Sequence, residues 1–583
     1  MGALNGITSC WRRINTPHVP FLLAGAVFAL LVLYATPANR GTDQFWYQSE
    51  VETLLAKQPP LSNIFYAGVY WRTHPQPSDN YFTHFTLVHY LVLPLSRMLG
   101  AHRGWIVSGL LVTLLGAICI ARVVRQYTQS ERFAIGAFCF FLFLPLTLWQ
   151  AGNMLQESFV ASWVAVVLYL YSLAFRRPAA SWALGVAAAL GVWVHPLFKV
   201  LVLLLPLYLA KRINNRSMLA RIGPVAVAYG LGGGCLLLQP ALFPNVGPQS
   251  LSAIIQASVP GGLPLAWYMA YDPEPLTFQF VTAKLLVALG GQVSMSVQGL
   301  SIYWPFNLMA MASVLLLVRV RMKEVRAVAL LAILHLVLYG SIVVLHQNQQ
   351  RYSLIATPPV MACAVIFLHR GAARISARWR RVGGGAIVVV FLGFLATDAA
   401  AVCKMRTSSV SATNDILVLQ SWSAPIPQSD RMLYIMTGGT FQYQLVGYAV
   451  YPRSIMVLVE EQIPDSRTRE VIDSFQPKWL IARATCRLEQ SLSMGLVATE
   501  LHRTNGWVLY RVAPAASSRP GIPAGGGQVL AVRAGPGAVS RGARRPARVD
   551  RPQPGESAGA VRVREQSFRR QRPADDRRSN ARL

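Results

Sequence analysis

Residues 19–35 read VPFLLAGAVFALLVLYA, and residues 36–47 read TPANRGTDQFWY. The first run is apolar and uncharged, so it predicts a membrane-spanning helix. Arg12 and Arg13 precede it, but no convincing small-residue cleavage pattern follows and many further apolar runs do. We therefore interpret it as an uncleaved first helix. The acid Asp43 lies just beyond its end, where the chain leaves the membrane.

The composition is that of an integral membrane protein. Of the 583 residues, 53% are hydrophobic and 13% charged, and the mean hydropathy is +0.39. The formal net charge of +30 comes largely from basic loops and an Arg-rich carboxy-terminal tail, so nucleic-acid binding is not needed to explain it. Attraction to anionic lipid headgroups is the expected consequence.

Clusters of Lys and Arg between the apolar runs predict the topology, because such residues accumulate in short cytoplasmic loops. If all the clusters are cytoplasmic, the segments between them cross the membrane in pairs. This arithmetic gives about eleven transmembrane helices, with the long loops on the outer face. The clusters lie at residues 12–13, 122–132, 176–177, 211–221, 319–326 and 369–381.

This topology predicts an α-helical polytopic membrane domain over residues 1–403. Residues 39–104 then form one large first external loop. Within it, the apolar stretch 84–99 is expected to lie along the membrane surface as an interfacial helix, and a short true span is the alternative. The weakly apolar stretch 278–297 raises the same question and is also placed outside.

Two further parts follow the last span. Residues 404–513 alternate short apolar runs with one polar, helical stretch at 466–475, which predicts a small external α/β domain. Residues 514–583 contain 15 Arg, five acidic residues and few large apolar residues. Such a segment cannot bury a core, so we expect a disordered basic tail.

Two acids stand out on the predicted external side. Ionisable groups at membrane depth cost about 2.5 to 3.5 kcal/mol, so their presence indicates function. Asp43 precedes an aromatic cluster and an expected helix that carries Glu50 and Glu52, and Glu157 ends the polar run 153–157. The structural alternatives are a helix N-cap for Asp43 and a helix-dipole charge for Glu157.

A third polar place is the run HQNQQRY at residues 346–352, between two apolar helices. Arg351 is the cation of this short external turn, against the trend for positive charge to face inward. Its guanidinium could bind a phosphate with two hydrogen bonds, and the alternative is an Arg that reaches toward the interface. His346 and Tyr352 flank this position.

The fourth place combines His74, late in the first external loop, with His195 and Lys199 near the outer end of a helical hairpin. A buried, hydrogen-bonded structural role is the alternative for each His.

Together these features resemble the GT-C superfamily of polytopic glycosyltransferases. The nearest subgroup contains the aminoarabinose, dolichyl-mannose-type and Rgt-like bacterial transferases. The resemblance rests on an uncleaved first helix, a long external loop that opens with an acid, a second external acid, an Arg-Tyr pair before a late helix and an external carboxy-terminal domain. It covers roughly residues 12–513 and lies in architecture and order rather than in a diagnostic string.

The resemblance implies an enzyme of the bacterial inner membrane that transfers a sugar from a polyprenyl-phosphate-linked donor to a lipid, glycan or protein acceptor on the outer face. Asp43 would act as the catalytic base or help to hold a divalent metal (Mg or Mn), with Glu157 as the second acid. The substrate-binding positions would be Arg351, Tyr352, His74, His346 and Lys199. Two departures from the family pattern are the missing Lys-Pro-Pro of the first loop and a Glu where many members carry Asp.

Two other classes of protein are the alternatives. A transporter or flippase of lipid-linked glycans should show related halves with mid-helix charges and broken helices, whereas this sequence shows no internal repeat and Asp398 is its main acid within a span. A non-catalytic, degenerate GT-C protein is favoured by the same two departures from the family pattern.

Overall fold

The structure of the protein is a computed structural model. It describes residues 19–39, 42–55, 64–66, 87–194, 215–237, 296–297, 300–301, 304–319, 323–345, 350–374, 376–436, 442–459, 472–486, 496–504 and 506–514. The expected tail at 514–583 lies almost entirely outside this part of the chain, as does the stretch 278–297 apart from its last two residues.

Three of the described helices are long and apolar enough to cross a membrane. They are α5 (Ala101–Thr128), α8 (Glu157–Ala174) and residues 383–423 of α19 (Ala377–Ser423). A fourth candidate is a helix pair, α6 (Glu131–Leu142) and α7 (Pro145–Ala151), bent by 54° at its break. The bend falls where Pro145 begins α7, because proline lacks the backbone N–H that would continue the helix.

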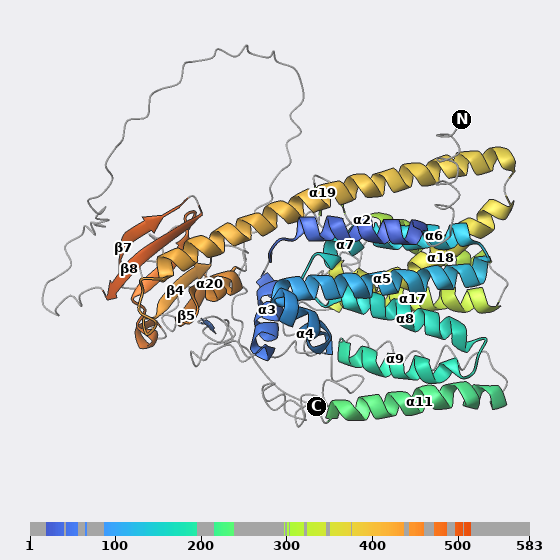
Figure 1. The fold of residues 1–583 in the computed structure, drawn as a ribbon, viewed down its shortest axis with the longest axis horizontal. Coiled ribbons are helices and arrows are strands. Elements are labelled where there is room, and N and C mark those ends of the chain that lie inside the picture. The colour runs from blue at the N-terminus through green and yellow to red at the C-terminus, as the bar shows by residue number, and fades with distance from the viewer. Residues whose placement is uncertain are drawn as a thin grey trace, which may run out of the picture. The chain divides into compact units, whose positions relative to one another are not determined.

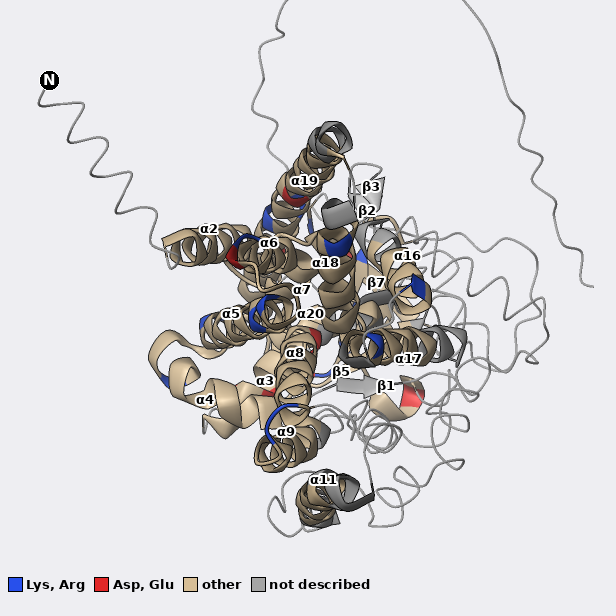
Figure 2. Ribbon diagram, turned by 90° about the vertical axis from the view of Figure 1, so that its right-hand side faces the viewer, with Lys and Arg blue, Asp and Glu red and all other residues tan. Residues whose placement is uncertain are grey.

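Shorter apolar helices accompany these spans. Uncharged residues make up most of their ribbons (Figure 2). Many large apolar side chains on the helices are open to the surroundings, for example Leu22 (71% exposed) and Val389 (69% exposed), as expected where lipid covers a helix. The structure therefore has several apolar helices, as a membrane protein requires, and the described residues do not fix the expected number of about eleven. The shorter apolar segments are α2 (Val19–Ala35), α4 (Leu87–Leu99), and parts of α9 (Ala180–Val194), α11 (Asn215–Leu237), α16 (Trp304–Arg319) and α17 (Lys323–Leu345). Helix α18 (Thr357–Arg374) packs against α5, α8, α16 and α17.

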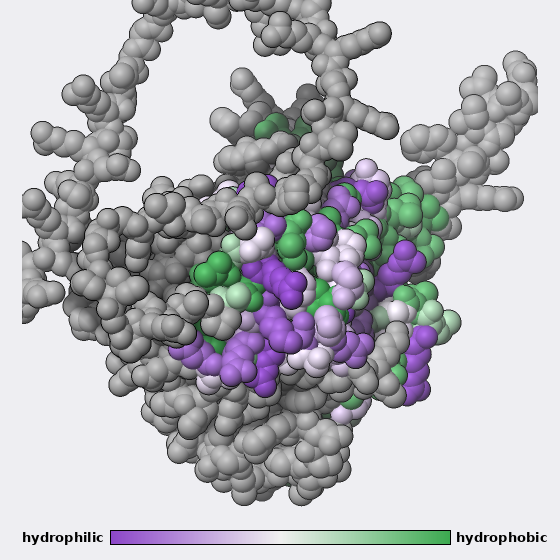
Figure 3. Space-filling model, turned by 90° about the vertical axis from the view of Figure 1, so that its left-hand side faces the viewer, coloured by the Kyte–Doolittle hydropathy of each residue, from purple (hydrophilic) through white to green (hydrophobic). Residues whose placement is uncertain are grey.

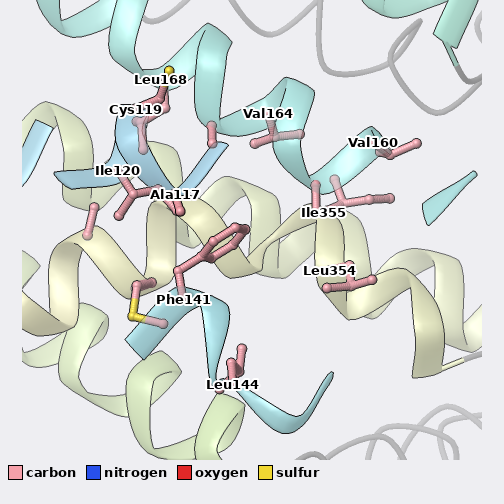
Figure 4. Close-up of a cluster of buried hydrophobic side chains, with 14 of the residues drawn as sticks. Ala117, Cys119, Ile120, Phe141, Leu144, Val160, Val164, Leu168, Leu354 and Ile355 are labelled. Carbon is pink, nitrogen blue, oxygen red and sulfur yellow. The ribbon is translucent and has the colours of Figure 1, made fainter. Parts of the chain in front are cut away.

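Close packing of α5 against its neighbours builds the core of the helical part. Lipid tails are as apolar as the side chains, so close backbone approach at small residues drives helix association. A Cβ on Gly116 of α5 would lie 2.9 Å from the Ser162 Cα of α8. Around this contact, Ile120 of α5, Leu168 of α8 and Phe141 of α6 meet as buried side chains (Figure 4).

A six-stranded mixed sheet follows the last span, in the order β1-β5-β4-β6-β8-β7. Strands β1, β5, β4 and β6 pair in parallel, whereas β6, β8 and β7 pair antiparallel. Hydrophilic residues cover much of the described surface at this end of the molecule (Figure 3), as expected for a part that faces water. The strands are β1 (Ile64–Tyr66), β4 (Met432–Met436), β5 (Ile455–Val459), β6 (Trp479–Arg483), β7 (Leu496–Arg503) and β8 (Trp507–Pro514).

The sheet joins two segments that are far apart in the sequence. Strand β1 lies between α3 and α4 in the sequence, yet Ile64 to Tyr66 pair with Ile455 to Val457 of β5. Helix α20 (Tyr443–Val450) and the outer turns of the 47-residue α19 pack on the same sheet through one buried cluster (Figure 1). Strand β1 and helix α3 are therefore part of the same folded body as the carboxy-terminal domain. A two-stranded ribbon, β2 (Ser296–Val297) and β3 (Leu300–Ser301), completes the described strands.

The contact between α4 and α5 predicts an unequal response to two alanine substitutions. A Cβ on Gly104 would lie 2.3 Å from the Ser96 Cα, so Gly104→Ala should cost about 1 to 3 kcal/mol of stability by forcing α4 and α5 apart. Gly136 of α6 has open space at its Cβ position, so Gly136→Ala should be neutral or stabilising by up to about 1 kcal/mol. Thermal unfolding of the purified protein in detergent measures both, and equal midpoints would contradict the packing.

Candidate functional site

Helix α3 (Thr42–Leu54) carries the first predicted acid. Asp43 is its second residue, in the turn where an acid is stabilised by the helix dipole. The side chain of Asp43 lies outside the described part of the structure. Its position is therefore known through the backbone of α3 and through the contacts of its neighbours.

Gln44 joins the start of α3 to the turn that precedes α8. Its Nε2 donates to Asn153 Oδ1 at 3.1 Å, and its Oε1 accepts a hydrogen bond from the backbone N–H of Met154 at 3.3 Å. Asn153 Nδ2 in turn donates to Gln150 Oε1 at 3.2 Å. All three amide side chains are buried, and buried amides are costly unless they are hydrogen-bonded. Residue 44 is therefore held against the segment that leads into Glu157.

Glu157 is the first residue of α8, and its side chain is 6% exposed. The predicted phosphate-binding segment around Arg351 also lies near the start of α8. The 3₁₀ helix η3 (Gln350–Ile355), which contains Arg351 and Tyr352, packs against α7 and α8. Its last residue, Ile355, lies beside Val160, about one turn after Glu157 (Figure 4). The structure thus brings three predicted segments together.

The remaining predicted positions fall elsewhere. His74, Lys199 and His346 lie outside the described residues. The side chains of Arg351 and Tyr352 are also outside the described part, so η3 places only their backbone. In the described ranges, no three His, Cys, Asp or Glu side chains form a group that could hold a metal ion.

A buried contact between a glutamate and a histidine joins α3 to α4. Glu50 Oε2 lies 2.5 Å from His89 Nε2, with the two side chains 1% and 0% exposed. The ring of Tyr47, on α3, stacks on His89 at 5.7 Å between centroids, and Trp105 of α5 meets His89 edge-on at 5.3 Å. The sequence analysis gave His89 no catalytic or binding role and counted it only as part of the expected interfacial helix 84–99. The sequence does show a His within a short apolar helix. A single sequence does not show that this His contacts Glu50, which lies on a separate helix.

The carboxy-terminal domain contacts a second face of α3, which carries Phe45, Gln48 and Glu52. The Tyr448 hydroxyl of α20 donates to Glu52 Oε1 at 3.1 Å and accepts from Gln48 Nε2 at 2.6 Å. The ring of Phe45 packs against Tyr448 at 5.3 Å between centroids. Burial, and then the adjacent Glu52 charge, raise the pKa of Tyr448 above its usual value, so the hydroxyl stays a donor at neutral pH.

The link between α2 and α3 is also held in place. Ser409 Oγ of α19 accepts from the Ala38 N–H at 2.8 Å and donates to the Ala38 carbonyl at 2.6 Å. His102 Nδ1 of α5 lies 2.7 Å from Asn39 Oδ1. Contacts therefore hold the link that precedes α3, the first turn of α3 at Gln44, and two faces of the helix, one against His89 and one against Tyr448.

No protein-family model matches the sequence, and comparison with curated protein sequences finds no significant match. Solved structures do match. The apo structure of ArnT from Cupriavidus metallidurans gives a TM-score of 0.52 at 13% identity, over 87% of this chain and 99% of that chain. The chain is therefore similar in fold to this GT-C membrane glycosyltransferase over most of its length.

Two further structures are similar at lower scores. ArnT from the same organism bound to undecaprenyl phosphate gives a TM-score of 0.45 at 12% identity, over 86% of this chain and 98% of that chain. The oligosaccharyltransferase of Archaeoglobus fulgidus tethered with an acceptor peptide gives 0.48 at 12% identity, over 84% of this chain and 74% of that chain. The fold comparison rests on the apo ArnT structure alone.

The bridge at Gln44 predicts a stability cost. Gln44→Ala leaves the buried Asn153 amide and the Met154 N–H without this partner, so it should destabilise the protein by about 1 to 3 kcal/mol. Gln420→Ala is the matched control, because Gln420 is exposed on α19 and should change stability by less than about 0.5 kcal/mol. Thermal unfolding compares the two, and an unchanged midpoint for Gln44→Ala would refute the bridge.

Proposed function

We propose that this protein is a membrane glycosyltransferase that moves a sugar from a polyprenyl-phosphate-linked donor to a lipid, glycan or protein acceptor on the outer face of the membrane. The observation that carries the proposal is the meeting of α3, the start of α8 and η3 in a GT-C-like fold. These segments carry Asp43, Glu157 and Arg351. The direct contact of Gln44 with Asn153 supports placing the two acids in one site.

The chemistry of sugar transfer suits this set of residues. The reaction passes through an oxocarbenium-like state, which an acceptor oxygen attacks as the phosphate leaves. Asp43 takes the proton from the acceptor hydroxyl as general base. Arg351 offsets the negative charge that grows on the departing phosphate oxygen, and Tyr352 lies beside it. The roles of His74, His346 and Lys199 as further substrate contacts belong to the same proposal.

A divalent metal is compatible with the acids of the proposed site. Mg or Mn takes oxygen ligands, which Asp43 and Glu157 would supply from α3 and α8. Such an ion would neutralise phosphate charge when bound. The base and phosphate roles of Asp43 and Arg351 do not depend on it.

The donor class follows from the position of the site and from the related protein. A lipid-linked donor keeps its prenyl tail in the bilayer and presents its sugar at the surface, so it needs a site at the outer ends of membrane helices. ArnT from Cupriavidus metallidurans, which shares the fold, binds undecaprenyl phosphate in one of its structures. We extend the donor class to this chain on that basis. The same proposal places the protein in the bacterial inner membrane. Residues 1–403 form its catalytic membrane part, residues 404–513 its external domain and residues 514–583 a basic tail.

The proposed base predicts the effect of an isosteric substitution. Asp43→Asn removes the proton acceptor and keeps the size of the side chain, so transfer should fall by at least about 100-fold while expression in the membrane stays unchanged. Asp473→Asn is the control, because Asp473 is an exposed acid of the external domain and should leave turnover unchanged. Transfer by purified protein with a panel of polyprenyl-phosphate sugars measures both. Full activity of Asp43→Asn would remove the role given to this residue.

The proposed phosphate contact predicts a change in donor dependence. Arg351→Ala loses charge-assisted hydrogen bonds to the donor, so KM for the donor should rise about 10- to 100-fold. Arg326→Ala is the control, because Arg326 is exposed on the first turn of α17, at the end of that helix away from η3. Steady-state kinetics with the donor and the acceptor varied separately decide the point. A change in acceptor dependence alone would show that Arg351 does not bind the phosphate.

A further inference from the structure

The Glu50–His89 pair is costly for the protein to keep. Each partner is at least 99% buried, and moving two polar, ionisable side chains out of water costs more than burying an apolar pair of similar size would. Apolar side chains would hold α3 on α4 as firmly. What the Glu50–His89 contact adds is direction, because only one rotation and one axial position of α3 bring the Glu50 carboxyl group onto His89 Nε2.

The direction of α3 matters because of what lies on it. Glu50 comes seven residues after Asp43, about two helical turns along the same helix. A rotation that separated Glu50 from His89 would move Asp43 by a similar angle. Tyr47, one turn before Glu50, stacks on His89 and also packs against Trp105 at 5.4 Å between centroids. The pair and its aromatic neighbours therefore fix the part of α3 that follows Asp43.

The same aromatic rings reach the helix of the second acid. Trp105 meets His89 on one side and Phe159 of α8 on the other, at 5.7 Å between centroids. Phe159 is two residues after Glu157. A continuous set of buried contacts thus runs from Glu50 through His89 and Trp105 to the first turn of α8.

We infer that Glu50 and His89 are positioning residues that fix the rotation of α3 relative to α8, and so hold Asp43 at the geometry that transfer requires. The consequence for transfer rests on the proposed function, whereas the effect on α3 itself does not. Neither residue touches substrate. Their pairing acts on the reaction only through the placement of Asp43.

The test separates positioning from ordinary stabilisation by comparing three variants of the full chain in detergent. Glu50→Leu and His89→Leu each remove one member of the buried pair and leave the other member without this contact, so both should lower the thermal midpoint. The double variant Glu50→Leu/His89→Leu replaces the pair with two apolar side chains and should regain the wild-type midpoint. Because it lacks the directional contact, backbone amides of 42–54 should still exchange hydrogen about tenfold faster than in wild type.

Turnover should follow the same pattern. In the double variant, kcat should fall about 100-fold, as expected for a misplaced catalytic group, while KM for the donor stays within about threefold of wild type. The control double variant is Arg125→Leu/Glu131→Leu, which removes an ion pair with 53% and 33% exposed side chains on α5 and α6. It should change neither amide exchange in α3 nor kcat.

The outcomes are distinct. Wild-type exchange in α3 together with wild-type kcat in the Glu50→Leu/His89→Leu variant would show that the pair only stabilises the fold. If wild-type protein transfers no sugar from any donor, the proposed function fails, and the exchange of α3 still decides whether the pair fixes this helix. If the double variant does not fold, Glu50→Gln provides the test, with faster exchange in α3 and about tenfold lower kcat at a preserved thermal midpoint expected. Unchanged values in that variant would overturn the inference.

Discussion

The placement of one short helix, α3, is the constraint on which the proposed site depends. Thirteen residues cannot form a stable helix alone, because isolated helices of this length are marginal in water. Its stability and its orientation must come from contacts with other elements. The structure supplies them through the Gln44–Asn153 hydrogen bond, the Glu50–His89 pair and the Tyr448 hydroxyl. Each contact reaches a different element, so together they leave α3 little freedom to slide or rotate.

The third of these contacts explains why the carboxy-terminal sheet domain and the apolar helices are one unit. Strand β1 and helix α3 both lie between α2 and α4 in the sequence, and both are bound to the carboxy-terminal domain, by backbone pairing with β5 and by side chains of α20. Helix α19 continues without interruption from its apolar span to this domain. The domain can therefore act on the site without contributing a catalytic residue, because its packing limits where α3 can lie.

The sequence predicted the class of fold from features with a direct physical signal. Long apolar runs such as residues 383–402, in which Asp398 is the one charged residue, indicate membrane helices, and alternating short apolar runs after residue 404 predicted the sheet that is observed. The order of acids, aromatics and an Arg-Tyr pair led to the GT-C resemblance, and the structure has that fold. For the candidate site, the topology argument expected Asp43 and Glu157 on one face, and the backbone segments that carry them are in contact. The catalytic and binding roles of these residues stay predictions.

Other features had no sequence signal. The pairing of Glu50 with His89 joins residues from separate helices, and β1 is a three-residue strand that pairs with a partner almost 400 positions away. Such contacts depend on how the elements pack, and local periodicity carries no information about them. The bend at Pro145 was readable in principle, because proline interrupts a helix. That the polar turn after α7 receives Gln44 follows only from the three-dimensional arrangement.

The measurement that tests the central claim most directly places the purified protein in liposomes that contain a polyprenyl-phosphate-linked sugar and a candidate acceptor. Two products are followed together, namely free polyprenyl phosphate and intact donor that has crossed the bilayer. The account predicts that polyprenyl phosphate is released in step with glycosylated acceptor. Movement of intact donor across the bilayer with no release of polyprenyl phosphate would contradict it, and would indicate a transporter of lipid-linked glycans.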